Sequence, residues 1–307
     1  MSDVTVTLEN ICKAYGGRTA VDGVDLVLRA GQRVALVGHN GAGKSTLIKL
    51  MLGLIRPVAG RVVVLGEDPA DRGAIRARGR LGYLPENVAL QPTLTGEELM
   101  AFYARLKRRP VSDNAEILER VGIAHAARWR VGTYSKGMRQ RLALAQAPIG
   151  SPRLLLLDEP TTGLDPALRQ TFYGIVQDLS AQGATVLLSS HALAELEGQT
   201  DRVVVMSQGR KVADGTMAEL RRLAQRPVRI KLTIHDDHLE LFPRIAGTAL
   251  AWRRVGERTF EISCTEHEKV TVVRQFTDGT LSVADVEIIP PTLDDIYAHF
   301  LCAEAAE

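Results

Sequence analysis

A short glycine-rich stretch of the sequence carries the residue types that bind phosphate. Residues 38–45 read "GHNGAGKS", which matches the pattern G-x-x-x-x-G-K-[ST] between an apolar strand, "VALV", and a helical pattern. In such a loop the backbone N–H groups point at phosphate oxygens, Lys44 supplies a cation that also serves catalysis, and the Ser45 hydroxyl is a ligand for Mg²⁺. A glycine-rich turn with an accidental match is the alternative, and the flanking strand and helix argue against it. The predicted phosphate-binding residues are Gly38, His39, Asn40, Gly41, Ala42, Gly43, Lys44, Ser45 and Thr46.

Two carboxylates and a histidine stand at the ends of later apolar segments. The segment "LLLLDEP" ends with Asp158 and Glu159, and "TVLLSSH" ends with His191. We expect Asp158 to be a ligand of Mg²⁺ and Glu159 to act on the water that attacks the terminal phosphate, either as general base or as positioner. We expect His191 to hold Glu159 and that water in line. Each element alone is more typical of a turn or of a structural histidine, so the prediction depends on their order after the phosphate loop.

A second anion site is indicated by the stretch "YSKGMRQR". Ser135 has the position of a helix N-cap, Gly137 permits close approach to the backbone, and the helical pattern continues to a stop at Pro148. The N-terminus of a helix attracts anions. A chain with a complete phosphate loop elsewhere has no evident need of a second site.

The composition indicates a globular protein with more than one domain. The chain has 307 residues, of which 45% are hydrophobic and 24% charged, and its net charge is +2. This charge leaves no basic footprint for nucleic acid. Cys12, Cys264 and Cys302 are too scattered for a disulfide framework or a cysteine metal site. No apolar run approaches the roughly 18 residues that cross a bilayer, and no signal-peptide pattern opens the sequence.

The apolar pattern changes along the chain and predicts two domains. An α/β core with mostly parallel strands is expected from the segments "RVALVG", "GRVVVLG", "RLLLLDEP", "ATVLLSS" and "DRVVVMS". The earlier segments "VTVTLEN" and "VDLVLRAG" alternate with period two, as in an antiparallel subsheet. Beyond them, short strands and helices predict a small α+β domain. We therefore expect one domain over residues 1–225 and a second over residues 226–307.

Taken together and in this order, the motifs "GHNGAGKST", "YSKGMRQRL", "LLLLDEPTTGLDP" and "SSH" resemble those of an ABC-transporter ATPase subunit. The resemblance covers residues 4–225 and implies the ABC nucleotide-binding fold, with a phosphate-loop core, an antiparallel β subdomain and a helical subdomain. It also implies that the chain binds and hydrolyses ATP with Mg²⁺. Tyr15 would stack on adenine, and Asp165, in the D-loop, would lie at a subunit interface.

By the same resemblance, Ser135 and Gly137 belong to the ABC signature motif and would contact the nucleotide bound by a second copy of the chain. This gives the second anion site a role. The chain departs from the family pattern at two places. Lys136 and Met138 replace a glycine and a glutamine of the signature, and Glu86 stands where many members have the Q-loop glutamine. A carboxylate at this position can still bind Mg²⁺, although it adds negative charge beside the other carboxylates.

The resemblance also implies partners and a location. A homodimer would lie beneath separately encoded transmembrane permease subunits, as a peripheral protein on the cytoplasmic face of the bacterial inner membrane. The segment "VEIIPPTLDDIYAHF" resembles the small accessory or dimerisation domains of cassettes that serve ABC-2-type permeases. A non-transport ABC ATPase of DNA repair or ribosomes is disfavoured by the single cassette and the lack of a basic stripe. A nucleotide-sensing regulator is disfavoured by the complete catalytic set.

A finer similarity concerns the strings "LGYLPENV", "RVGTYSKGMRQRLALAQA" and "PTLDDIY". They are similar to the ATPase of the Nos copper-processing ABC system, which serves nitrous-oxide reductase maturation in denitrifying bacteria. That similarity implies copper or sulfur handling and a periplasmic copper-associated protein as a partner through the complex. Because several of these strings also occur in ATPases of ABC-2 drug, lipid or polysaccharide exporters, an exporter remains the alternative.

Overall fold

Three strands of one six-stranded sheet end at the phosphate loop, at Asp158 and directly before His191. Its strands are β3 Arg33–Val37, β5 Leu81–Leu84, β6 Leu154–Asp158, β7 Thr185–Ser190, β8 Arg202–Ser207 and β9 Arg210–Gly215. In this computed structural model the order is β5-β6-β7-β3-β8-β9, and all neighbours are parallel except β8 and β9. Strands β6 and β7 are buried along their whole length, which accounts for their continuous apolar sequences. The predicted parallel core is confirmed, and the carboxyl ends of β3, β6 and β7 lie at one edge of the sheet.

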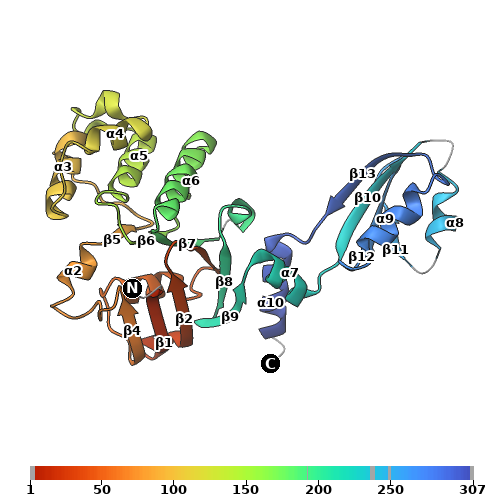
Figure 1. Ribbon diagram of the computed structural model, residues 1–307, viewed down its shortest axis with the longest axis horizontal. Coiled ribbons are helices and arrows are strands. Elements are labelled where there is room, and N and C mark those ends of the chain that lie inside the picture. The colour runs from red at the N-terminus through yellow and green to blue at the C-terminus, as the bar shows by residue number, and fades with distance from the viewer. Residues whose placement is uncertain (1–3, 192, 236–238, 248–249, 305–307) are drawn as a thin grey trace. The chain divides into compact units, whose positions relative to one another are not determined.

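A three-stranded antiparallel sheet accompanies this core. Its strands are β1 Val4–Tyr15, β2 Arg18–Arg29 and β4 Ala59–Val64, in the order β2-β1-β4 (Figure 1). The predicted antiparallel pairing of the first two segments is confirmed. The prediction that "GRVVVLG" lies in the parallel core is wrong, because it forms β4 and pairs antiparallel with β1. Val62 and Val64 are buried while Val63 is partly exposed, which is the one-sided burial of an antiparallel strand rather than of a parallel core strand.

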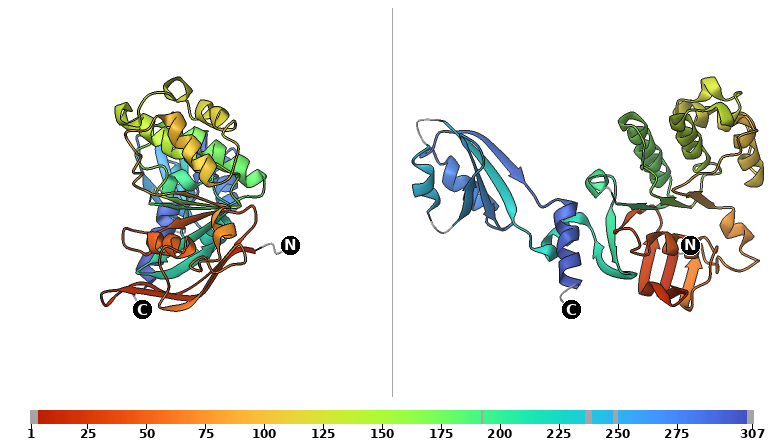
Figure 2. Two further views of the ribbon diagram at one scale, coloured as in Figure 1. Left: turned by 90° about the vertical axis from the view of Figure 1, so that its left-hand side faces the viewer. Right: turned by 180° about the vertical axis from the view of Figure 1, so that it is seen from behind.

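Helices cover the sheets and place several motif residues at their ends. They are α1 Lys44–Met51, α2 Ile75–Arg78, α3 Gly96–Leu106, α4 Asn114–Arg120, α5 Lys136–Gln146 and α6 Pro166–Ala181, with the 3-10 turns η1 Ala124–Ala126, η2 Val131–Thr133 and η3 Leu193–Leu196. Helices α3, α4 and α5 pack on one another as a helical subdomain (Figures 1 and 2). Ser135 caps α5 by accepting a hydrogen bond from the backbone N–H of Met138 at 3.1 Å, which confirms the predicted cap.

The C-terminal part forms a small α+β unit with its own core. Its elements are α7 Met217–Ala224, β10 Val228–Ile234, α8 Phe242–Ala246, β11 Ala251–Arg254, β12 Thr259–Cys264, α9 Lys269–Thr277, β13 Val283–Ile289 and α10 Leu293–Glu304. The four strands form an antiparallel sheet in the order β11-β12-β10-β13. Phe242 stacks between Phe260 and Phe276, with ring centroids 4.0 and 5.1 Å apart. This aromatic cluster provides a large share of the buried apolar area of so small a unit.

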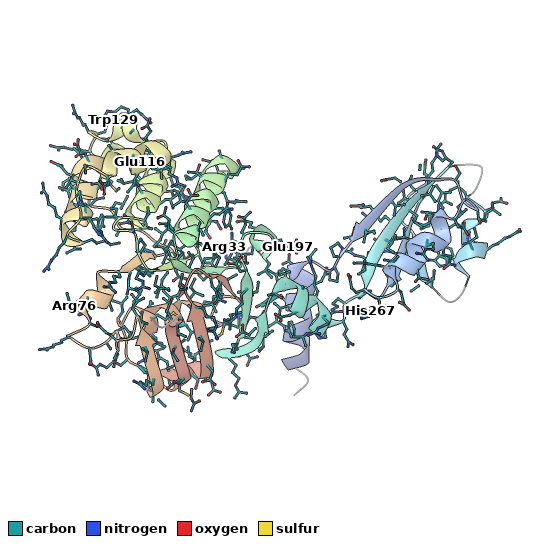
Figure 3. The ribbon with its side chains drawn as sticks, in the orientation of Figure 1. Arg33, Arg76, Glu116, Trp129, Glu197 and His267 are labelled. Atoms are coloured by element: carbon teal, nitrogen blue, oxygen red, sulfur yellow. The ribbon has the colours of Figure 1, made fainter. Side chains whose placement is uncertain are left out.

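The structure describes residues 4–191, 193–235, 239–247 and 250–304. Contacts divide the chain into the units Met1–Thr216 and Met217–Glu307, so the boundary precedes the one predicted after residue 225. The reason is that α7 packs against α10, and Arg221 Nε donates to the carbonyl of Pro291 at 3.0 Å. Arg33 lies at the end of β3 that is far from the phosphate loop (Figure 3). Its Nη2 is 2.6 Å from Asp201 Oδ1. Within the described ranges, no helix is both long enough and apolar enough to cross a bilayer.

Candidate active site

The glycine-rich loop joins β3 to α1 and leaves an open cradle of backbone. Gly43 precedes α1 with φ 101°, a conformation that favours glycine. A Cβ on Gly38 would lie 2.6 Å from the carbonyl oxygen of Met206, and one on Gly43 would lie 2.6 Å from that of Ala20. Side chains are therefore excluded at both positions, and the N-terminus of α1 stays accessible to an anion.

Lys44 places a nearly buried cation in this cradle. Its side chain is 6% exposed, and Nζ donates to the carbonyl of Gly38 at 2.5 Å. Nζ also lies 3.5 Å from Oε1 of Glu159. A desolvated ammonium of this kind is a strong binder for phosphate oxygens.

The cavity around Lys44 has a volume of about 800 Å³, which is large enough for a nucleotide. It is lined by Tyr15, Arg18, Thr19, Ala20, His39, Asn40, Gly41, Ala42, Gly43, Lys44, Ser45, Thr46, Glu86, Glu159 and Gln208.

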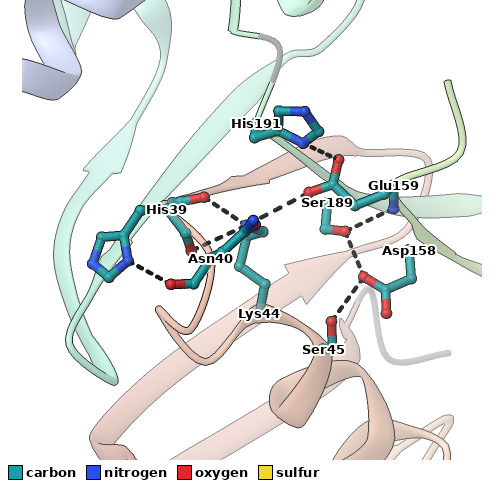
Figure 4. A network of polar contacts seen from close by, with 9 residues as sticks. His39, Asn40, Lys44, Ser45, Asp158, Glu159, Ser189 and His191 are labelled. Carbon is teal, nitrogen blue, oxygen red and sulfur yellow. Dashed lines mark hydrogen bonds and ion pairs between the residues drawn. The ribbon is translucent and has the colours of Figure 1, made fainter. Parts of the chain in front are cut away.

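A chain of hydrogen bonds joins α1 to the ends of β6 and β7 (Figure 4). Ser45 Oγ donates to Asp158 Oδ1 at 3.1 Å, and Ser189 Oγ donates to the same oxygen at 2.7 Å. Ser189 also accepts from the backbone N–H of Glu159 at 3.0 Å. A hydroxyl and a carboxylate side by side are the oxygen ligands that Mg²⁺ prefers, so the residues present fit this ion.

Glu159 and His191 form the second half of the site (Figure 4). His191 Nδ1 lies 2.7 Å from Glu159 Oε2, while Glu159 Oε1 is buried and has no hydrogen-bond partner in the described structure. Glu159 also has φ 50°, which is strained for a residue with a side chain. Oε1 lies 3.5 Å from the Lys44 ammonium but accepts no hydrogen bond, so it is suited to accept one from a water. The arrangement can therefore orient a water beside a bound phosphate.

Tyr83 on β5 lies near the carboxylates of this site. Burial, and after it the charge of Asp158, raise the pKa of the Tyr83 phenol above its usual value. The phenol is therefore even less prone to ionise beside Asp158 than an exposed tyrosine.

Ser189 is a site residue that the sequence motifs do not single out. Its signal was present in the sequence, since two serines interrupt an otherwise apolar strand directly before His191. Ser189 is fully buried and is bonded to both carboxylate residues. Ser189 therefore holds the side chain of Asp158 and the backbone of Glu159 in place at the end of β6.

We expect Ser189→Ala to lower the turnover number about tenfold and the free energy of unfolding by about 1–2 kcal/mol. The reason is that the buried N–H of Glu159 loses its acceptor and Asp158 loses a donor. Steady-state ATPase kinetics and denaturant unfolding measure the two effects. Ser180→Ala is the matched control, because Ser180 Oγ donates to Gly31 O at 2.7 Å away from the site. A control that loses as much turnover would contradict the positioning role of Ser189.

The other predicted site residues divide into two groups. Tyr15, 47% exposed at the end of β1, and the exposed Glu86 after β5 both line the phosphate cavity. Ser135, Gly137 and Asp165 do not line it. Ser135 is exposed at the N-terminus of α5, and Asp165 caps α6 by accepting from Leu168 N at 2.8 Å. No described side chain provides an anion for Ser135, whose Oγ accepts only the capping N–H of α5.

Comparisons with known proteins agree with this geometry. Residues 21–162 match the family model described as ABC transporter. The daunorubicin resistance ATP-binding protein DrrA3 of Streptomyces coeruleorubidus is 36% identical to this chain, over 97% of the chain and 96% of the relative. The chain belongs to the ABC transporter family as an ATP-binding subunit. The linearmycin resistance ATP-binding protein LnrL of Bacillus subtilis (strain 168) is similar at 32% identity, over 95% of the chain and 96% of the relative.

The fold of this ABC ATPase matches a solved structure of its family. The structure described as the ATP binding subunit of an ABC transporter has a TM-score of 0.67 and 32% sequence identity, over 71% of this chain and 92% of the other. The chain is accordingly an ATP-hydrolysing transporter subunit with the ABC nucleotide-binding fold. Subunits of this kind work as dimers with transmembrane permease partners.

Proposed function

We propose that two copies of this ABC ATPase bind head to tail and hydrolyse MgATP at their interface. The supporting observation is that the phosphate cavity lacks Ser135 and Gly137, although the N-terminus of α5 is exposed and suited to an anion. Ser135 and Gly137 would meet the nucleotide held by the partner copy, and Asp165 would lie at the same interface. Two-fold symmetry then gives two equivalent sites.

Within each site the residues divide the chemistry between them. Ser45 and Asp158 would hold Mg²⁺, with Glu86 at the rim as a third oxygen ligand, and the ion would neutralise phosphate charge. The loop of residues 38–46 would bind the phosphates, and Tyr15 would contact the adenine ring. Glu159 would accept a proton from the attacking water or orient it, and His191 would hold Glu159 in place.

The names of the relatives support a proposal for the cargo class. DrrA3 and LnrL are named for resistance to daunorubicin and to linearmycin, and both align with nearly the whole chain, including the C-terminal unit. We therefore assign the chain to an exporter of small organic toxins, peripheral to the cytoplasmic face of the bacterial inner membrane. The C-terminal unit is assigned an accessory or dimerisation role.

Purification of the chain with its permease and reconstitution into vesicles tests the cargo class. Daunorubicin is the first probe, and it should raise the rate of ATP turnover several-fold over the unstimulated rate. Stimulation by copper alone, with no response to organic compounds, would overturn the assignment to a toxin exporter.

Copper handling for nitrous-oxide reductase, with a periplasmic copper-associated partner, is the second candidate function. It rests on the sequence strings around Glu86, Ser135 and the C-terminal "PTLDDIY" alone. The two relatives named above carry no reference to copper. Within the described residues there is no group of three or more histidine, cysteine, aspartate or glutamate side chains that could hold a metal ion, so copper would be handled by partners.

A further inference from the structure

A few buried polar atoms of the described structure have no hydrogen-bond partner. Among the described residues, four buried side-chain nitrogen or oxygen atoms lack a hydrogen-bond partner. Two of these atoms, Nε of Arg169 and Oε2 of Glu195, belong to residues that form a single ion pair. The other two are Oε1 of Glu159 and Nδ2 of Asn114. Such atoms are rare in native proteins because each one costs desolvation energy. The ion pair therefore requires a functional explanation.

The ion pair joins two segments that carry site residues. Arg169 lies on α6, one turn after the D-loop residue Asp165, and Glu195 lies on η3, four residues after His191. Arg169 Nη1 is 2.8 Å from Glu195 Oε1, and the two side chains are only 34% and 21% exposed. Arg169 Nη2 also donates to the carbonyl of Leu164 at 3.4 Å. The pair thus ties the loop before α6 to the segment that follows His191.

Tyr173 lies beside the Arg169–Glu195 pair and next to the loop that follows Glu159. It lies one turn beyond Arg169 on α6 and close to the buried side chain of Thr161, two residues after Glu159. Burial, together with the nearby carboxylate of Glu195, raises the pKa of Tyr173 to about 12. The phenol therefore stays uncharged beside the Arg169–Glu195 pair over the whole physiological pH range.

We propose that Arg169, Tyr173 and Glu195 are positioning residues for ATP hydrolysis. They hold the segment after His191 against the loop after Glu159, and so maintain the 2.7 Å contact between His191 Nδ1 and Glu159 Oε2. None of the three lines the phosphate cavity, so they act through other residues. The strained backbone of Glu159 also needs such support, because a positive φ persists only where the surroundings enforce it. The proposal rests on the roles proposed above for Glu159 and His191.

Glu195→Gln tests this positioning role in the full-length protein. It keeps the shape of the side chain and removes the charge that pairs with Arg169. We expect the turnover number for ATP to fall about tenfold, while KM and the affinity for ATP stay within about twofold, because a misaligned water slows the chemical step without weakening phosphate binding. Tyr173→Phe should lower the turnover number by a smaller factor in the same direction.

The control variant is Asp214→Asn, which breaks another sheltered ion pair. Arg202 Nε lies 2.6 Å from Asp214 Oδ1, and these side chains are 23% and 16% exposed. We expect this variant to lower the melting temperature as much as Glu195→Gln does and to keep the wild-type turnover number. The double variant Arg169→Met, Glu195→Gln should be no slower than the slower of the two single variants, because the pair acts as one unit.

Three outcomes would overturn the proposal: an unchanged turnover number in Glu195→Gln, an equal loss in Asp214→Asn, or a loss in Glu195→Gln that appears only in KM. The turnover of Glu159→Gln is measured alongside. If Glu159→Gln is inactive while Glu195→Gln is fully active, only the positioning role fails. If Glu159→Gln itself keeps normal turnover, the proposed role of Glu159 fails instead.

Discussion

Glu159→Gln is expected to lower ATP turnover by about 100-fold or more while leaving ATP binding intact. The amide keeps the size of the side chain and a hydrogen bond to His191, but it cannot accept a proton from the attacking water. Lys44 would also lose the anionic neighbour that lies 3.5 Å away, which favours its contact with phosphate. Bound ATP should therefore persist and accumulate a dimer, visible by size-exclusion chromatography with light scattering.

The control for this prediction is Glu119→Gln, which makes the same change of charge at an exposed position on α4. It should leave turnover and oligomeric state unchanged. Near-normal hydrolysis by Glu159→Gln would rule out a role of this carboxylate in activating or orienting water. Loss of ATP binding in the same variant would instead indicate that Glu159 supports the phosphate loop through Lys44.

Ser135→Arg is expected to abolish ATPase activity while leaving ATP binding to the isolated subunit nearly unchanged. Ser135 does not line the phosphate cavity of its own chain, so the substitution should not disturb that cavity. In the proposed dimer the arginine would occupy the space of the partner's terminal phosphate and remove the Ser135 hydroxyl contact that stabilises charge during hydrolysis. Fluorescent-nucleotide titration and steady-state turnover measure the two effects.

Ser112→Arg is the matched control, because it introduces the same side chain at an exposed serine that precedes α4, outside the cavity. It should retain wild-type turnover. Circular dichroism checks that α5 still folds without the cap that Ser135 gives to Met138 N. Loss of nucleotide binding by the isolated Ser135→Arg subunit would place this helix N-terminus in the site of its own chain.

Local motifs explain why much of the site could be anticipated from the sequence. The phosphate loop is contiguous, so its glycines, Lys44 and Ser45 are readable together. Asp158, Glu159 and His191 stand at the ends of apolar segments, and parallel strands bring their carboxyl ends to one edge of a sheet. The pairing of Ser45 with Asp158 and of Glu159 with His191 follows from that topology.

The features of the site that could not be predicted depend on contacts between segments that lie far apart in the sequence. The polar residues at the end of β7 are visible in the sequence, but the bonds of Ser189 to Asp158 and Glu159 depend on the pairing of β6 with β7. The pair of Arg169 with Glu195 depends in the same way on the contact between α6 and η3. The segment that forms β4 was misplaced because three consecutive valines resemble a buried parallel strand, whereas only one face of β4 is covered. Nothing in the structure explains the lysine at position 136.

The lysine at that position is nonetheless compatible with the capped helix. Residue 136 is the first residue of α5 and is exposed, and the cap of this helix uses the backbone N–H of Met138, which any residue except proline supplies. The anion-binding capacity of the α5 N-terminus therefore does not depend on the family glycine and glutamine.

Mixing two inactive variants tests the head-to-tail dimer most directly. Lys44→Ala loses the phosphate loop of its own chain, and Ser135→Arg loses the signature it offers to a partner. In a mixed dimer, the loop of the Ser135→Arg chain faces the signature of the Lys44→Ala chain, so one complete site forms. The account predicts that an equal mixture recovers about one quarter of wild-type turnover, since half of the dimers are mixed and each has one intact site. A mixture as inactive as its components would contradict the account.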